Sequence, residues 1–199
     1  MKKWLIPLIV IVLIGVAFYQ WSVNINNTAV ELEANAKTAW SNVESEYQRR
    51  NDLIGDLVKI VKGAADFERT TLREVIEARA KATATTIDVG DLTPENMAKF
   101  QQAQAGLSGA LSRLLVSVER YPELKANENF LKFMDERTST ANSIRTARNR
   151  YNEAVNKYDI YTTQFPNKLV AGMFGFKEMA RYKADPGSEK TPDIDLDFN

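Results

Sequence analysis

The most informative pattern in the chain is an apolar run close to its N-terminus. No charged side chain occurs between Trp4 and Val30, and the first twenty residues of this stretch are almost entirely apolar. A helix of about 20 apolar residues crosses a hydrocarbon core of roughly 30 Å. The pattern therefore predicts a transmembrane anchor at residues 4–23, after a short flank at residues 1–3.

The two ends of the run distinguish an uncleaved anchor from a cleaved signal peptide. The basic pair Lys2-Lys3 suits either of them, but the run ends in bulky side chains rather than in a small-x-small cleavage site. Amphipathic rings settle at headgroup level. We therefore favour an uncleaved anchor and expect Trp4, Tyr19 and Trp21 to be its membrane-interface anchors.

The distribution of basic residues predicts the orientation of this anchor. Lys2-Lys3 precedes the apolar run, and the next basic residue after it is Lys37. Basic flanks remain on the cytoplasmic side of a membrane. We expect the N-terminus inside and the large folded part outside.

Beyond the anchor, apolar residues recur at alternating steps of four and three, the periodicity of a core-facing helix. Most positions in this series are apolar from Ala36 to Ala82, and a second apolar line runs beside it at a spacing of seven. Such a stripe is wide enough for a helical bundle rather than a two-stranded coiled coil. We expect one helix over about residues 29–83, which in one interpretation is continuous with the membrane span, and Gly55 and Gly63 are its weak points.

Three further helices follow in the pattern. Thr93 is the expected N-cap of the second helix, which ends near Tyr121. The third, over about residues 130–165, is expected to begin after a cap at Asn127 or Asn129 and to stop at a proline. A short fourth helix is expected over about residues 167–182, interrupted at its glycines. The predicted fold is all-α: an antiparallel bundle of three long helices plus a short C-terminal helix, behind one N-terminal transmembrane helix.

This pattern sets the expected domain limits. The helical bundle domain covers residues 29–184, and residues 185–199 form a flexible acidic-hydrophobic tail. In this tail Ile194, Leu196 and Phe198 alternate with aspartates, a period of two that suits an extended segment.

Composition excludes several kinds of function. The chain has 26 basic and 26 acidic residues, whereas nucleic-acid binding calls for a basic excess. It has no cysteine and no histidine, which removes disulfides, thiolate and imidazole metal sites and the Ser-His-Asp triad. We therefore predict no catalytic residue, no cofactor, no metal and no nucleic-acid partner. A carboxylate-based hydrolase is the weakest alternative.

Four charged residues fall on the apolar stripes: Arg50 and Glu68 in the first predicted helix, and Arg137 and Arg148 in the third. One interpretation is an interhelical polar network that recognises an anionic or peptide ligand. The other is a set of ion pairs that fixes the helix register, because buried charges are costly unless they are paired. We favour the second.

Several short sequence blocks follow one another along the chain: Ala39–Val43, Gln48–Ile54, Leu57–Gly63, Leu111–Leu115, Glu119–Asn127, Ala147–Asn152, Phe165-Pro166, Ala171–Phe176 and Pro192–Phe198. They resemble the signature of the LemA family and cover nearly the whole chain beyond the anchor. Two places depart from that pattern. Gly55-Asp56 stands where the family usually has Pro-Asn, and Thr140–Ile144 lacks the usual Glu and Arg.

The resemblance implies a membrane-anchored helical bundle of the bacterial cytoplasmic (inner) membrane and no assigned reaction. Some family members are linked to the building of specialised membrane compartments. We therefore expect a non-enzymatic scaffold or interaction protein, which contacts the lipid bilayer and unknown membrane or envelope proteins and for which homo-oligomers are possible. The alternative is a ligand-binding or accessory subunit with a polar pocket around Arg50, Glu68 and Arg148.

Overall fold

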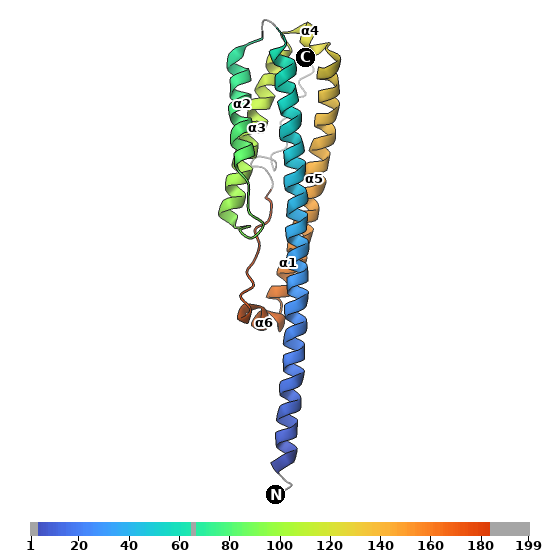
Figure 1. Cartoon of the computed structure of the whole chain (residues 1–199), viewed down its shortest axis with the longest axis vertical. Helices are drawn as coiled ribbons and strands as arrows, with labels where there is room; N and C mark the ends of the chain where they lie inside the picture. The colour runs from blue at the N-terminus through green and yellow to red at the C-terminus, as the bar shows by residue number, and fades with distance from the viewer. Residues whose placement is uncertain (1–3, 65–66, 184–199) are drawn as a thin grey trace, which may run out of the picture.

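The computed structural model describes residues 4–64 and 67–183, and the regular secondary structure within them is entirely helical. This confirms the predicted all-α class. In chain order the helices are α1 (Leu5–Lys62), α2 (Arg69–Ala84), α3 (Pro94–Val118), α4 (Pro122–Lys125), α5 (Glu128–Thr163) and α6 (Asn167–Met173) (Figure 1). The tail predicted at residues 185–199 lies outside the described residues.

The first helix, α1, is one unbroken helix of 58 residues, which is about 87 Å at 1.5 Å per residue. Every residue from Trp4 to Gln20 is exposed, and burial begins at Trp21. By length and composition α1 is the one helix, in the part of the chain that the structure describes, able to cross a membrane; the mean hydropathy of its most apolar stretch is 2.1. The rings expected at the interfaces lie within or next to this exposed segment.

The remaining helices gather around the upper part of α1. Helix α5 packs lengthwise against α1, α2 pairs with α3, and α2 also contacts α1. Figure 1 shows these four helices side by side, with α4 as a single turn between α3 and α5. Helix α6 packs on both α5 and α1 at the lower end. We call this assembly, from Trp21 onwards, the helical body.

The prediction of a single helix over residues 29–83 is wrong. Helix α1 ends at Lys62, and α2 begins at Arg69 after a turn that starts at Gly63, one of the two predicted weak points. The apolar period continues through this turn because α2 contributes Val75 and other residues to the same core. Because the apolar positions of α2 continue the spacing of those in α1, the periodicity does not reveal that the chain reverses direction between the two helices.

The other predicted weak point, Gly55, lies inside α1 and makes room for a contact between helices. A Cβ atom at Gly55 would lie only 3.0 Å from Nη2 of Arg79, which belongs to α2. The Nε of Arg79 donates to the carbonyl oxygen of Asn51 at 2.7 Å. The missing side chain thus lets Arg79 bond α2 to α1.

Local capping chemistry begins the next two long helices as expected. The Thr93 hydroxyl accepts from the backbone N–H of Asn96 at 3.3 Å, and a proline occupies the first position of α3. The Asn127 carboxamide oxygen accepts from the N–H groups of Asn129 and Phe130 at 2.9 and 3.4 Å. These caps satisfy backbone donors that have no partner within the helix.

The fourth helix is shorter than the expected residues 167–182. Helix α6 ends at Met173, and Gly175 takes a φ of 80°, a left-handed conformation that favours glycine. The following residues, 174–183, run back along α5 without helical structure. We call them the C-terminal strap.

Two apolar clusters hold the helical body together. The proximal core centres on Trp40 of α1, whose ring centre lies 5.3 Å from that of Phe100 in α3 and 5.2 Å from that of Tyr151 in α5. Side chains of α1 to α5 contribute to the distal core, between the α1–α2 turn and α4. Its buried members are Ile54, Leu57, Val58, Val61, Phe67, Leu72, Val75, Ala82, Leu107, Ala110, Leu111, Leu114, Val118, Leu124, Phe130 and Phe133.

Candidate functional site

A groove of about 580 Å³ lies between α1, α3 and α5 and joins apolar and cationic side chains. Its floor includes Leu53, Ile54, Leu111, Phe133 and Ile144. Three arginines line it, and the described lining residues include no aspartate or glutamate. In a chain with equal numbers of acidic and basic residues, this is a local concentration of positive charge above an apolar surface. The arginines are Arg50, Arg137 and Arg148.

Arg50 spans the groove from α1 to α3. Its Nη1 donates to the Ser108 hydroxyl at 3.3 Å, and its Nη2 donates to both oxygens of Gln104, with the backbone carbonyl at 3.3 Å. The guanidinium also lies over the Tyr47 ring, 4.9 Å from its centre. Gln104 is buried and donates in turn to the Ala82 carbonyl at 3.4 Å. These contacts fix the direction of the Arg50 side chain.

Arg148 lies where the C-terminal strap meets the groove. Its guanidinium carbon is 3.8 Å from the centre of the Tyr182 ring, a distance typical of a cation–π contact. Its Nη2 donates to the Lys183 carbonyl at 3.2 Å. The Tyr182 hydroxyl shares a hydrogen bond of 2.6 Å with the Tyr47 hydroxyl of α1. The strap is therefore attached to the groove from two sides.

The four charged residues predicted on the stripes do not form one set. Arg137 lies exposed on α5 and lines the groove with Arg50 and Arg148. Glu68 lies before α2 and forms an ion pair of 2.8 Å with Arg120. The polar pocket expected around Arg50, Glu68 and Arg148 therefore needs correction, because Glu68 is not among the groove residues.

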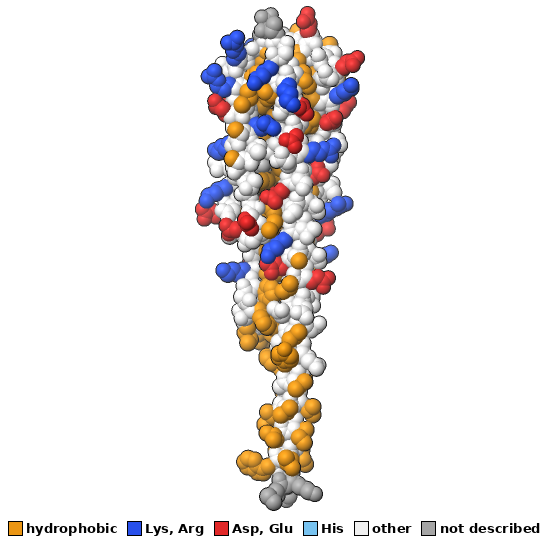
Figure 2. All heavy atoms as spheres, viewed as in Figure 1, with side chains coloured by type: hydrophobic (Ala, Val, Ile, Leu, Met, Phe, Trp, Pro, Cys, Tyr) orange, Lys and Arg blue, Asp and Glu red, His pale blue; other side chains and the backbone are white. Residues whose placement is uncertain are grey.

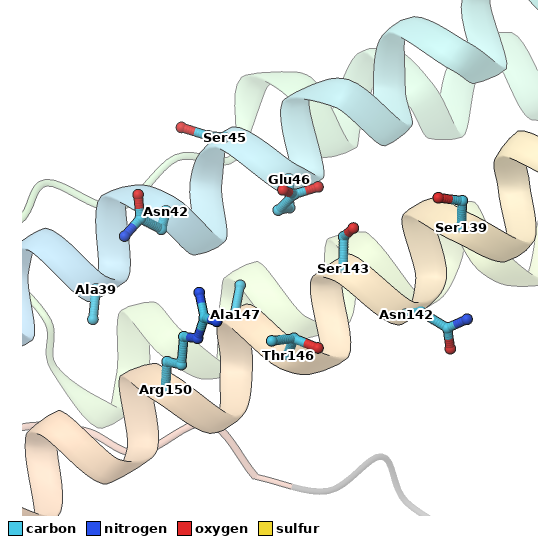
Figure 3. A pocket seen from close by; sticks show the side chains of 10 residues that line it. All are labelled: Ala39, Asn42, Ser45, Glu46, Ser139, Asn142, Ser143, Thr146, Ala147 and Arg150. Atoms are coloured by element: carbon cyan, nitrogen blue, oxygen red, sulfur yellow. The ribbon is translucent and has the colours of Figure 1, made fainter.

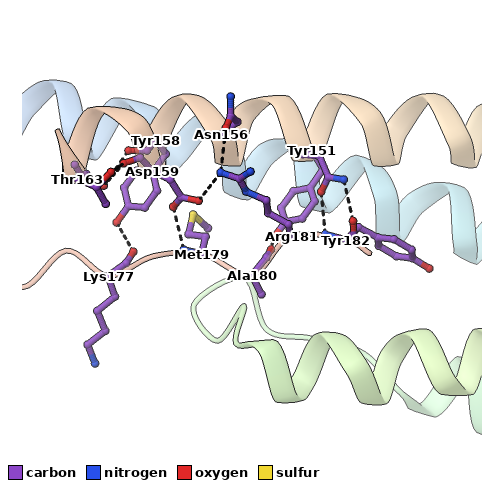
Figure 4. A network of polar contacts seen from close by, with 12 residues as sticks. Tyr151, Asn156, Tyr158, Asp159, Thr163, Lys177, Met179, Ala180, Arg181 and Tyr182 are labelled. Carbon is purple, nitrogen blue, oxygen red and sulfur yellow. Dashed lines mark hydrogen bonds and ion pairs between the residues drawn. The ribbon is translucent and has the colours of Figure 1, made fainter. Parts of the chain in front are cut away.

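The strap is attached to α5 by side chains that bond its backbone, as Figure 4 shows. The Tyr151 and Tyr158 hydroxyls donate to the Ala180 and Lys177 carbonyls at 2.5 and 2.9 Å. Asn152 binds both backbone groups of Tyr182: its Oδ1 accepts from the N–H at 2.8 Å, and its Nδ2 donates to the carbonyl at 2.9 Å. Side chains of α5 thus satisfy several backbone groups of this extended segment, and the Ala180 N–H donates to the Leu92 carbonyl at 3.1 Å.

An ion pair adds to this attachment. Arg181 of the strap lies 3.2 Å from the Asp159 carboxylate and also donates to Asn156 at 3.0 Å. The other carboxylate oxygen of Asp159 accepts from the Met179 N–H at 3.3 Å. These contacts recur along most of the strap, so its course beside α5 is well determined.

A second groove, of about 530 Å³, follows the other side of the α1–α5 contact. Figure 3 shows its lining of mostly short polar side chains, with Glu46 and Arg150 as its charged members. One charge of each sign gives no net preference for a charged ligand. The groove with three arginines is therefore the better candidate site.

Several residues of the candidate site were not expected from the sequence. Gln104 had a visible signal, since it is a polar residue on the apolar stripe of the second predicted helix. Tyr47 had a weaker signal in the sequence. Tyr182 had no such signal, because its position depends on the course of the strap. Within residues 4–64 and 67–183, no group of three or more carboxylates is arranged to hold a metal ion.

The two tyrosines of α5 that bond the strap are weaker acids than an exposed tyrosine. Burial raises the pKa of Tyr158 to about 12, and the Glu33 carboxylate adds to the rise. Burial also raises the pKa of Tyr151, with Asp159 as the smaller cause. Both phenols remain protonated in the folded state well above neutral pH, as their role as hydrogen-bond donors requires.

These phenols predict an alkaline limit to stability. An unfolded tyrosine ionises near pH 10, so the folded state binds more protons at higher pH. The stabilisation is complete below about pH 10 and is lost as the pH rises through about 12. We expect an absorbance titration of the full chain to show a late phase that coincides with loss of helical circular dichroism. The Tyr158→Phe variant should lose one phenol from that phase, and a titration without a late phase would contradict the account.

Comparison with known proteins identifies the family of this chain. The LemA family profile matches residues 39–198. The chain is 26% identical over 208 residues to magnetosome protein MamQ 2 of Paramagnetospirillum magneticum, covering 94% of this chain and 75% of that protein. It is 26% identical to MamQ of Magnetospirillum gryphiswaldense, covering 84% and 68%. It is 24% identical to protein LemA of Metamycoplasma hominis, covering 92% and 80%. Because the family profile spans most of the chain, this protein belongs to the LemA family.

Proposed function

We propose that this protein is a membrane-anchored, non-enzymatic interaction protein that holds a partner at a bacterial membrane. The observation that carries the proposal is the continuity of α1. Its exposed apolar segment passes without a break into a helical body that bears a cationic groove with an apolar floor. Similarity to proteins named for the magnetosome and to a protein named LemA supports a role at a membrane.

The proposal includes a membrane arrangement. Residues 4–23 form a single-pass anchor in the bacterial cytoplasmic (inner) membrane, and residues 29–184 form one antiparallel bundle domain. The N-terminus is inside and the bundle outside, since Lys2-Lys3 is the basic flank of the anchor.

The groove suits a partner segment that combines carboxylates with apolar side chains. Arginine binds carboxylate through charge-assisted hydrogen bonds that are stronger than neutral ones. The floor residues offer apolar surface to the neighbouring side chains of an extended peptide. The chain's own sequence at Asp193–Phe198 has this alternation, so a second copy of the protein is one source of such a segment.

A second candidate function uses the same groove. Arg50 and Arg148 both line it, and a small anionic ligand would bind there if the protein were an accessory subunit rather than a scaffold. A small anion would bind to the arginines, but it is too short to contact the full length of the groove. The two functions therefore differ in whether a peptide or a small anion binds.

Protease accessibility tests the membrane arrangement. Protease added to intact spheroplasts should digest the chain beyond residue 30, because the bundle lies outside the cytoplasmic membrane. A cytoplasmic marker protein should survive the same treatment. Full protection of the chain before lysis, followed by digestion after lysis, would overturn the orientation.

Peptide binding tests the groove. The probe is a fluorescent peptide with the sequence of Pro192–Asn199, added to the full chain in lipid nanodiscs. To prevent competition from the attached tail, the chain carries Asn in place of Asp193, Asp195 and Asp197. We expect Arg137→Glu to weaken binding about tenfold, which is 1.4 kcal/mol. Added salt should weaken it too.

The matched control is Arg145→Glu, an exposed arginine on the same helix that does not line the groove. It should leave the affinity unchanged. Equal effects of the two variants, or equal binding of a peptide with Asn in place of Asp, would refute recognition by the groove. Competition by inorganic phosphate as strong as that by unlabelled peptide would favour the small-anion alternative.

A further inference from the structure

The lower end of the helical body exposes a group of large apolar side chains around α6. Phe165 is 82% exposed, Met173 78% and Leu169 62%, whereas Val170 and Ala171 on the other side of α6 are each 2% exposed. We call the exposed group the α6 patch; its members are Ile160, Phe165, Leu169, Met173 and Phe174. Figure 2 shows hydrophobic side chains gathered at this end and along the exposed segment of α1 below it.

Between Ile160 and Lys177 the charged side chains have one sign, whereas the acidic residues Asp159 and Glu178 directly flank this stretch. No aspartate or glutamate occurs from Ile160 to Lys177, and the two lysines in this stretch, Lys168 and Lys177, are exposed. Helix α1 has no charged residue before Glu31. In Figure 2 the acidic and basic side chains are spread over the upper part of the molecule instead. Apolar residues flanked by lysine are typical of a surface that enters a membrane interface.

The position of α6 along α1 agrees with such a surface. Helix α6 contacts α1, and along α1 the side chains become partly buried from Trp21, with Ile25 the first that is fully buried, at the end where α6 lies (Figure 1). These residues follow Tyr19 by about 3–9 Å at 1.5 Å per residue. The headgroup region extends roughly 5–8 Å beyond each side of the hydrocarbon core. The patch is therefore at the depth of the headgroups when the apolar segment of α1 spans the core.

We propose that α6 is a membrane-interface helix, which places the α6 patch among the headgroups and upper acyl chains of the leaflet from which α1 emerges. This inference rests on the proposed anchoring by α1. Together α1 and α6 hold the helical body at two places, so its tilt on the membrane is restricted and its groove is kept at a defined height. The lysines contact lipid phosphates beside the patch.

The absence of cysteine from the chain makes a direct test possible. Leu169→Cys and Met173→Cys are each labelled with an environment-sensitive fluorophore in the full chain, reconstituted in phosphatidylcholine–phosphatidylglycerol vesicles. Lipids with bromine near the upper acyl chain then serve as quenchers. We expect about a twofold loss of emission at both sites, and less quenching in vesicles without the anionic lipid.

Two control variants are labelled in the same way for comparison. Leu8→Cys lies in the exposed apolar segment of α1 and should be quenched by lipids with deeper bromines. Val116→Cys is also highly exposed, at 72%, but lies in α3 near the far end of the helical body, and should not be quenched. All four positions are exposed, so none of the labels needs space in the core.

Each outcome decides something. If Leu169→Cys and Met173→Cys resemble Val116→Cys while Leu8→Cys is quenched, the α6 patch faces water and the inference is overturned. A blue-shifted emission without quenching would also overturn the inference. It would identify a second copy of the protein as what covers the α6 patch. If Leu8→Cys is not quenched by any lipid, the anchoring itself fails, which is a separate result.

Discussion

The lengthwise packing of α5 against α1 is the contact on which the rest of the structure depends. At its centre Trp40 of α1 is fully buried between Phe100 and Tyr151, which ties three helices to one side chain. Burial of a large aromatic residue contributes several kcal/mol. Because α1 is unbroken, this contact also determines where the apolar N-terminal segment points relative to the helical body. The second helix pair, α2 and α3, then completes the distal core, with Arg79 held against α1 at Gly55.

The candidate site follows from the same contact. Arg50 and Arg148 come from the two packed helices, α1 and α5, and each is oriented by an aromatic ring and a backbone carbonyl. The C-terminal strap adds Tyr182 to the groove because tyrosine and asparagine side chains of α5 satisfy its backbone. The groove therefore belongs to the assembled helices and not to any one segment. In this LemA family protein the groove and the exposed apolar segment of α1 therefore belong to one assembled body.

The sequence predicted what depends on local chemistry and missed what depends on assembly. The caps at Thr93 and Asn127 and the apolar stripe of α1 follow from neighbouring residues, so they were predicted well. The reversal after Gly63 was missed because α2 keeps the apolar spacing, and Glu68 was therefore assigned to a helix although it lies before α2. The strap was expected to be helical because its hydrogen-bond partners lie on α5, roughly 20–30 residues earlier in the chain.

The continuity of α1 implies that its exposed apolar segment and the helical body form one rigid unit. It is tested most directly by the distance between two spin labels at Val12→Cys and Gln48→Cys, two exposed positions on one face of α1, measured by pulsed electron resonance in nanodiscs. A continuous helix places them about 54 Å apart, at 1.5 Å per residue, so we predict a single narrow distance distribution near that value. A broad distribution, or one centred at a clearly shorter distance, would show a hinge between membrane and core and would contradict the account.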